Sequence, residues 1–283
     1  MSCRRWCSHD HPCDAAPAEK ASADLQQAAG PQPVGNVQLS GEVFLWQVGN
    51  VLVPLISLFV WQAAIASGAQ LPTTPRYLTA YFVLISIVNM LTNSWTAFYL
   101  AEEIRGGGLN RYLCRATSTH VDALANNVGE KVIKLILLVP MVAVLAVALG
   151  DRFDLPQALW RWLLAFGCLI IAALMTWLLD VMIGSLAFWF SDVNGFLRAS
   201  EVIVPLLSGA VIPLALLPDA LHGLSQVQPF RFLVSFPLEV LLGNVQGGLV
   251  TGLLCQLGWL LVFAAAARLI WRLGIRTYSG AGA

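Results

Sequence analysis

The chain has 283 residues and no formal net charge at pH 7, and 58% of its residues are hydrophobic whereas only 11% are charged. A soluble domain carries about a quarter charged residues, so this composition excludes a water-soluble globular protein and predicts an all-α polytopic membrane protein. The zero net charge also argues against nucleic acid as a partner, because no basic surface is available to hold phosphates.

Residues 1–36 are rich in alanine, proline, glutamine and glycine and show no apolar period. This composition predicts a disordered N-terminal tail, followed by a membrane-spanning domain at residues 37–283. No apolar stretch follows Arg4 and Arg5, so we do not expect a signal peptide.

Six apolar segments follow, at about residues 43–67, 77–100, 121–149, 162–190, 202–217 and 248–270. A helix needs about 20 residues to cross roughly 30 Å of hydrocarbon. The third segment reaches that length because an amphipathic run leads into its apolar part. The fifth needs flanking residues, because Pro205, Gly209 and Pro213 interrupt it. We therefore predict six transmembrane helices.

The connection between the second and third segments carries the densest polar chemistry of the chain. Gly106 to Gly108 end the second helix, and the string LNRYLCR then places leucines and tyrosine on one side and arginines on the other. A short amphipathic helix of this kind suits docking into a partner's groove. The alternative is an interfacial loop whose arginines contact anionic headgroups. The candidate docking residues are Arg105, Leu109, Arg111, Tyr112, Leu113 and Arg115.

Asp180 is the clearest acidic residue inside an apolar segment, in the string WLLDVMIG of the fourth span. An ionisable group at membrane depth is a functional candidate by default. Asp180 lies in the cytoplasmic half of its predicted span. Two structural alternatives therefore stay open, in which its carboxylate reaches the headgroup region or caps a neighbouring helix.

The stretch HGLSQVQPFRFLVSFPLEVLLGNVQ, between the fifth and sixth segments, is too apolar for a free loop and too interrupted for a span. Pro237 is suited to open a short helix that runs through Leu242, and Gly243 is suited to close it. We predict a re-entrant or interfacial segment packed against the spans, because irregular backbone at membrane depth must be covered by protein or line a wet cavity.

The orientation follows from lysine and arginine alone. With both termini in the cytoplasm, twelve of these residues lie on the cytoplasmic side and four on the other, namely Arg76, Arg152, Arg161 and Arg231. An even number of spans allows this arrangement. We therefore expect a multi-pass protein of the inner (cytoplasmic) membrane with both termini inside the cell.

Motifs for catalysis or nucleotide binding are missing from the sequence. It has no HExxH or GxSxG string, and no GxxxxGK[ST] loop to hold ATP phosphates. We therefore expect no enzymatic activity of its own, no catalytic residue and no cofactor. We also expect no metal site, because common zinc-ligand spacings are not met by Cys3, Cys7, His9, His11 and Cys13.

Five strings, in this order, resemble the membrane-spanning permease of bacterial ATP-binding-cassette exporters of the type-2 (ABC-2) class, in the branch with six spans. The strings are WTAFYLAEEIRGGGLNRYLCR, FWFSDVNGF, PLALLP, PFRFLVSFPLEVLLG and RLGIRTYSGAGA. The resemblance covers about residues 40–283. One departure is Ala116, where the family usually has proline.

The resemblance implies that the connection after the second span is a cytoplasmic coupling helix, which contacts a separate ATPase subunit. It also implies two ATPase copies, with a second copy of the permease or a related permease completing the transporter. The resemblance to this branch favours a small hydrophobic or cationic compound, so an unknown small hydrophobic or amphipathic substrate is expected.

Two other functions compete with this interpretation. A secondary transporter driven by an ion gradient would normally show paired repeats and charged residues at the membrane midplane, and no repeat relates residues 43–149 to residues 162–270. A membrane-embedded enzyme is disfavoured because no catalytic cluster is present.

Overall fold

The computed structural model describes residues 41–68, 73–109, 119–150, 156–217, 219–245 and 247–278. The chain divides into two compact units, Met1–Phe44 and Leu45–Ala283, and the description below concerns the second. Every regular element in the described residues is an α-helix or a 3-10 helix. This confirms the prediction of an all-helical chain.

Five helical stretches are long and apolar enough to cross a membrane. They run over Val48–Ala66, Pro75–Arg105, Val121–Ala148, Leu159–Phe188 and Leu249–Thr277. They lie in α2 (Gly41–Ala66), α3 (Pro75–Thr92) with α4 (Thr96–Arg105), α6 (Thr119–Leu149), α7 (Leu159–Ser185) and α11 (Leu249–Thr277). The first, second, third, fourth and sixth predicted segments are therefore helical. The amphipathic run before the third segment is continuous with it in α6, as predicted.

The outward faces of these helices are covered with large apolar side chains, as expected for a protein that lies in lipid. Phe59, Leu163 and Val250 are each more than 60% exposed, and they belong to three different candidate spans. A soluble protein rarely exposes contiguous apolar patches of this extent. The chain is therefore a polytopic membrane protein.

The fifth predicted segment differs from the expectation. It begins in α8 (Asn194–Ser208), which has 15 residues and is too short to be counted as a span, and continues in the 3-10 helix η3 (Leu214–Leu216). Gly209 ends α8 with a φ of 86°, a left-handed conformation that glycine adopts without strain. Five candidate spans, not six, are thus found among the described residues.

The stretch between the fifth and sixth segments folds into three short pieces. They are α9 (Asp219–Val227), the 3-10 helix η4 (Pro229–Leu233) and α10 (Ser235–Leu242). α10 ends where predicted, because Gly243 follows it with a φ of 75°. Ser235 to Leu241 are all buried, so α10 is a core element although it is only eight residues long.

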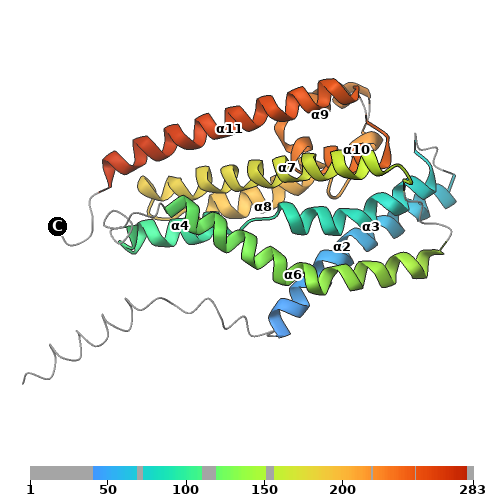
Figure 1. The fold of residues 1–283 in the computed structure, drawn as a ribbon, viewed down its shortest axis with the longest axis horizontal. Helices are drawn as coiled ribbons and strands as arrows, with labels where there is room; N and C mark the ends of the chain where they lie inside the picture. The colour runs from blue at the N-terminus through green and yellow to red at the C-terminus, as the bar shows by residue number, and fades with distance from the viewer. Residues whose placement is uncertain are drawn as a thin grey trace, which may run out of the picture. The chain divides into compact units, whose positions relative to one another are not determined.

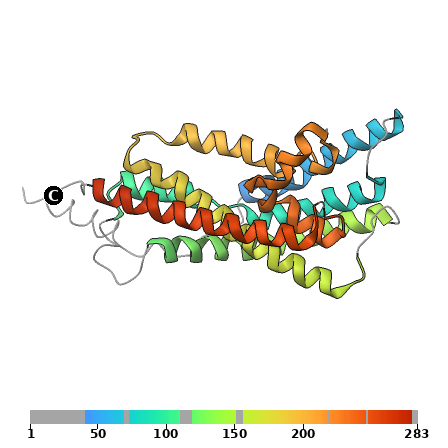
Figure 2. The ribbon, with the colours of Figure 1, turned by 90° about the horizontal axis from the view of Figure 1, so that it is seen from above.

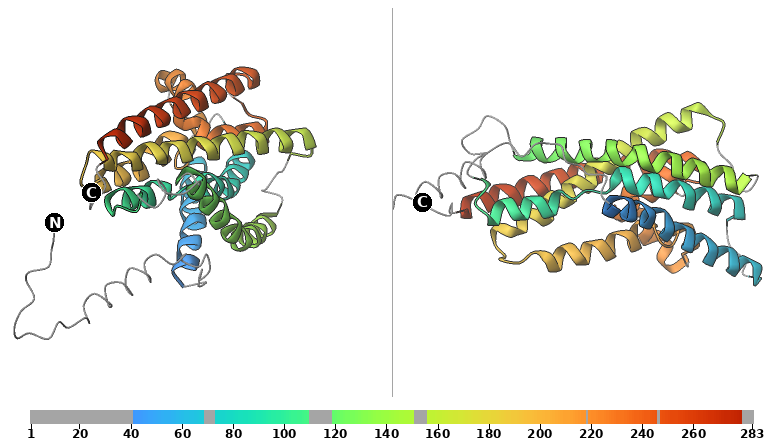
Figure 3. Two further views of the ribbon diagram at one scale, coloured as in Figure 1. Left: turned by 60° about the vertical axis from the view of Figure 1, so that its left-hand side comes forward. Right: turned by 90° about the horizontal axis from the view of Figure 1, so that it is seen from below.

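α7 is the helix around which the second unit is built. It packs against α11, α4, α10 and α3, and α3 also packs against α6. α6 and α8 lie on opposite sides of α4 and α7 (Figures 2 and 3). α4, α7 and α11 end at the left of Figure 1, where α6 and α8 begin. The main core cluster includes Tyr81 and Phe82 of α3, Phe232 of η4, Phe236 of α10 and Phe263 of α11, so four elements supply its buried aromatic side chains.

Candidate functional site

The second span is interrupted in a way that its sequence did not predict. α3 ends at Thr92 and α4 begins at Thr96, with Asn93 to Trp95 outside either helix. The Thr92 hydroxyl donates to the carbonyl of Val88 at 3.0 Å. The first amides of α4 have no partner within their own helix, and the side chain of Trp95, at the N-cap, does not supply one.

Asp180 of α7 supplies part of this cap. Its Oδ2 accepts a hydrogen bond from the backbone N–H of Ala97 at 3.4 Å. Ser94 accepts from the N–H of Thr96 at 3.3 Å and donates to the Thr96 hydroxyl at 3.0 Å. A carboxylate at a helix N-terminus is favourable, because it faces unsatisfied N–H groups and the positive end of the helix dipole. This geometry matches the capping alternative, and a role of Asp180 in transport stays a prediction.

Two further contacts hold α4 in place, one against α7 and one against the chain that follows α7. At Gly184, a Cβ would meet the carbonyl oxygen of Ala97 at 2.8 Å, so only glycine allows the two helices to approach this closely. At the end of α4, Arg105 Nη1 donates to the carbonyl of Ser191 at 3.1 Å, and its Nη2 pairs with Glu102 Oε1 at 2.5 Å. We call the contacts of Asp180, Gly184 and Arg105 the α4 clamp.

Of the six predicted docking residues, Arg105 and Leu109 belong to the described residues. Arg105 belongs to the α4 clamp and is half-buried. Leu109 is 1% exposed, so its side chain packs within this chain. Arg111, Tyr112, Leu113 and Arg115 lie outside the described residues. The structure thus describes the point from which the connection departs.

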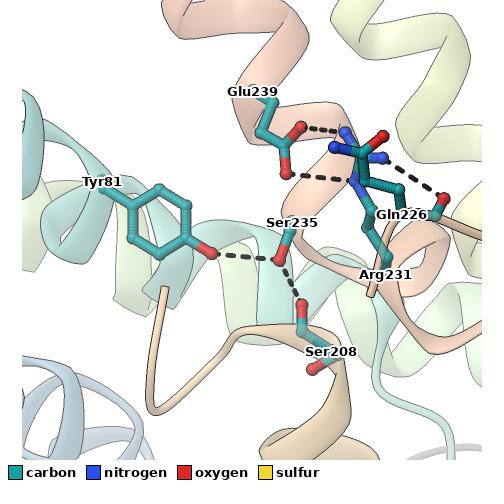
Figure 4. Close-up of polar contacts among 6 residues, drawn as sticks. All are labelled: Tyr81, Ser208, Gln226, Arg231, Ser235 and Glu239. Carbon is teal, nitrogen blue, oxygen red and sulfur yellow. Dashed lines mark hydrogen bonds and ion pairs between the residues drawn. The ribbon is translucent and has the colours of Figure 1, made fainter. Parts of the chain in front are cut away.

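A second polar site lies in the core around α10, where Arg231 and Glu239 form a buried ion pair (Figure 4). Nη2 lies 2.5 Å from Oε2 and Nε lies 3.3 Å from Oε1, so the pair is bidentate. The two side chains are 3% and 8% exposed. Arg231 Nη1 also donates to the carbonyl of Gln226 at 3.3 Å, and its guanidinium lies 5.9 Å and 5.8 Å from the ring centres of Phe232 and Phe236.

A hydroxyl network adjoins this pair. The Tyr81 hydroxyl donates to the carbonyl of Gly209 at 2.9 Å and lies 3.1 Å from Ser235 Oγ. Ser235 in turn donates to the carbonyl of Ser208, as Figure 4 shows. The network therefore joins α3, the end of α8 and the start of α10. We call these residues, with Arg231, Glu239 and Gln226, the α10 network.

Gln256 extends the polar contacts from this region to the last span. It is fully buried in α11, and its Nε2 donates to the carbonyls of Cys168 at 2.9 Å and Phe232 at 3.3 Å. One side chain thus joins α11 to α7 and η4. In lipid, such interhelical hydrogen bonds contribute about 0.6–2 kcal/mol each.

The α10 network was not predicted from the sequence. Arg231 was counted only as one of the four cations outside the cytoplasm, and Glu239 was not singled out. Within one helix, side chains three or four residues apart can pair. These two residues are eight apart and belong to different helices. The available signal was the presence of two opposite charges in one otherwise apolar stretch, since charges at membrane depth pair with each other.

No group of three or more histidine, cysteine, aspartate or glutamate side chains suited to a metal ion is found in the described ranges. The cysteines and histidines considered for zinc, at positions 3, 7, 9, 11 and 13, fall outside those ranges. Two polar sites are described in the second unit: the α4 clamp, which involves α7 at Asp180 and Gly184, and the α10 network, which Gln256 joins to α7 at Cys168.

Comparison with known families gives one match. A family model described as "ABC-2 family transporter protein" matches residues 44–282, a stretch that contains the α4 clamp and the α10 network. A search among curated proteins returns no match.

Proposed function

The chain belongs to the ABC-2 family of transporter proteins, and from this premise we propose that it is the permease subunit of an ATP-driven exporter. As the membrane component of such a transporter, it would form the substrate pathway and couple to a separate ATPase. The sequence supports this division of labour, because it contains no phosphate-binding loop for ATP.

The proposal includes six crossings of the membrane. α8 runs in the opposite direction to α7 (Figure 2), and η3, α9, η4 and α10 then lead to the start of α11. If α8 and η3 together form the fifth crossing, both ends of the membrane domain lie on one side. α9 to α10 would then form the re-entrant segment, which is tolerated because its polar backbone is covered by α3, α7 and α11.

Charge supports placing that side in the cytoplasm. Arg105, Arg198 and Arg276 belong to the ends of α4 and α11 and the start of α8, which lie together in Figure 1. An excess of arginine and lysine marks the cytoplasmic side. The connection after α4 would then face an ATPase inside the cell, as a coupling helix.

The α4 clamp is the observation that carries the coupling proposal. α4 is held to α7 at its start by Asp180 and in its middle by Gly184, and its end is held by the bond from Arg105 to Ser191. A displacement of residues 109–118 would therefore move α4 and α7 together. Rigid elements with packed contacts are the physical means by which such a displacement travels.

The remaining partners follow from the family. Two ATPase copies and either a second copy of this chain or a related permease would complete the transporter, in contact with membrane lipid. The substrate would be a small hydrophobic or amphipathic compound. No nucleic acid is expected.

The test uses the full chain expressed with a candidate ATPase partner, in inverted membrane vesicles supplied with fluorescent hydrophobic amines. We expect accumulation that requires ATP and disappears when the ATPase phosphate-loop lysine is replaced. Tyr112→Ala should weaken recovery of the ATPase with the permease by about tenfold or more, because losing a buried aromatic anchor often costs about 2 kcal/mol. Arg111→Ala should have a smaller effect, which shrinks at high salt.

Two results would contradict the proposal. Accumulation driven by a proton or sodium gradient without any ATPase would favour a secondary transporter. Unchanged ATPase recovery and transport in Tyr112→Ala would indicate that the connection contacts only lipid headgroups.

A further inference from the structure

An apolar groove of about 210 Å³ lies between α3, α7 and α10. Its lining has no charged side chain, and six of the lining residues are Leu84, Val88, Ala165, Leu169, Leu238 and Leu241. Pockets for drug-sized ligands occupy about 300–1,000 Å³ and include a few polar groups that fix orientation. This groove is smaller and lacks such groups, so its shape suits part of an acyl chain.

Arg161 does not line the groove itself but directly precedes Trp162, one of its lining residues. It precedes Ala165 by four residues and Leu169 by eight, so the three residues share one face of α7. A Cβ on Gly243, just after α10, would meet Arg161 Cζ at 2.8 Å, so the guanidinium lies where α10 ends. The groove therefore runs away from Arg161 along α7 and α10, towards Leu169.

The charge of Arg161 is not neutralised by an acidic side chain in the described part of the chain. Its Nε is buried and has no hydrogen-bond partner, and its guanidinium lies 5.5 Å from the ring of Trp160. An arginine whose charge is not paired within the chain favours a phosphate, because its planar group forms bidentate hydrogen bonds with phosphate oxygens.

The depth of these residues fits a phospholipid. Arg161 lies in the first turn of α7 between two tryptophans, the residue type that is enriched where a span meets the headgroups. Trp162 also lines the groove, and its Nε1 donates to the carbonyl of Pro156 at 2.9 Å. At 1.5 Å per residue, Ala165 and Leu169 lie about 6 and 12 Å deeper, at the level of the acyl chains.

We propose that Arg161 and this groove bind one anionic phospholipid, with its phosphate on the guanidinium and one acyl chain between α3, α7 and α10. The positive charge of Arg161 favours an anionic headgroup. The apolar groove packs protein side chains against one acyl chain, in place of neighbouring lipid. The site is separate from the coupling connection and does not depend on the identity of the exported substrate.

The experiment measures lipid retention by native mass spectrometry on the purified full-length chain. The two probes are phosphatidylglycerol and phosphatidylcholine with identical palmitoyl and oleoyl chains. We expect one phosphatidylglycerol to be retained in preference to phosphatidylcholine. Arg161→Gln should lower phosphatidylglycerol retention about fivefold, the effect of about one cation at a membrane surface, and Arg161→Lys should keep most of it.

Matched variants separate the groove from general effects. Ala165→Phe fills the groove and should lower retention of both lipids. Leu163→Phe, on the same helix but 67% exposed, should leave retention unchanged. Arg76→Gln removes an exposed cation at the start of α3 and should also leave it unchanged.

Several outcomes would overturn the proposal. Equal retention of the two lipids by the unmodified chain would overturn it. Equal losses of phosphatidylglycerol retention in Arg161→Gln and Arg76→Gln would also overturn it. Efficient disulfide cross-linking of Trp162→Cys between two copies in membranes would show that a second copy covers the groove. Unfolding temperatures of all variants, measured alongside, identify any that fail to fold.

Discussion

The α4 clamp and the α10 network hold neighbouring helices together by different means. In the clamp, Asp180 accepts a hydrogen bond from the amide of Ala97, and Arg105 donates one to the carbonyl of Ser191. In the network, Arg231 and Glu239 form a bidentate pair that is almost completely buried. The clamp therefore depends on individual hydrogen bonds, whereas loss of one partner of the buried ion pair leaves an uncompensated charge in the core.

Under the proposed function, this difference would divide the molecule into a movable and a fixed part. A transporter driven from one side needs elements that move relative to each other and others that keep their fold while this happens. On this interpretation α4 transmits displacement, and the short helices around α10 keep the opposite half of the bundle intact. The four predictions that follow test this contrast.

The largest effect is expected from breaking the buried ion pair. Glu239→Ala leaves Arg231 charged and buried without its partner, which costs about 3–5 kcal/mol. The purified chain should then unfold at a much lower temperature, or fail to fold. The matched control is Glu201→Ala, which removes the partner of Arg198 from a pair whose side chains are 54% and 81% exposed and should cost at most about 1 kcal/mol. Similar losses in both variants would refute the special role of the α10 network.

A smaller loss is expected where α4 approaches α7. Gly184→Ala places a Cβ 2.8 Å from the carbonyl of Ala97 and 3.1 Å from Leu100 Cβ, so the helices must separate, at a cost of about 1–3 kcal/mol. Gly167→Ala is the matched control on the same helix, because its Cβ would meet nothing within 4 Å. If α4 transmits displacement, Gly184→Ala should also lower transport per ATP hydrolysed. Unchanged stability and unchanged coupling would show that the close approach is not required.

The third prediction concerns the hydroxyl that joins three elements. Tyr81→Phe leaves the ring in place but removes the donor to the carbonyl of Gly209 and the contact with Ser235. A buried acceptor without its partner costs about 1–3 kcal/mol, which thermal unfolding in detergent would detect. Tyr99→Phe is the control, because Tyr99 is 64% exposed and should show no measurable change. Equal unfolding temperatures in the two variants would mean that the Tyr81 hydroxyl does not stabilise the core.

Sequence reasoning predicted the fold better than either polar site, and the reason is physical. Five spans follow from hydropathy, which averages over many residues and tolerates local errors. Gly209 was expected to interrupt the fifth segment, and it does end α8. The interruption between α3 and α4 lies in an apolar segment without glycine or proline, so the sequence carries no local signal for it. The Arg231–Glu239 pair depends on how η4 and α10 fold back on each other, and no local pattern encodes that.

Changes at Asp180 are expected to have the smallest effect on stability of the four predictions. They also separate two possible roles of this residue, capping of α4 and a role in transport. If the carboxylate only caps α4, Asp180→Asn keeps an acceptor for the amide of Ala97, and unfolding should change by a few tenths of a kcal/mol at most. Asp180→Ala removes the acceptor and should cost about 1 kcal/mol. ATP-dependent transport should follow stability: it should be nearly unchanged in Asp180→Asn and lower in Asp180→Ala.

A role in transport predicts the opposite order. If the negative charge acts on the substrate or on a cation such as Lys131 of α6, then Asp180→Asn should lose most ATP-dependent transport while its unfolding temperature stays unchanged. Asp180→Glu, which keeps the charge, should then retain more activity than Asn. Measuring transport and unfolding on the same three variants separates the two roles, because capping needs a hydrogen-bond acceptor and transport would need the charge.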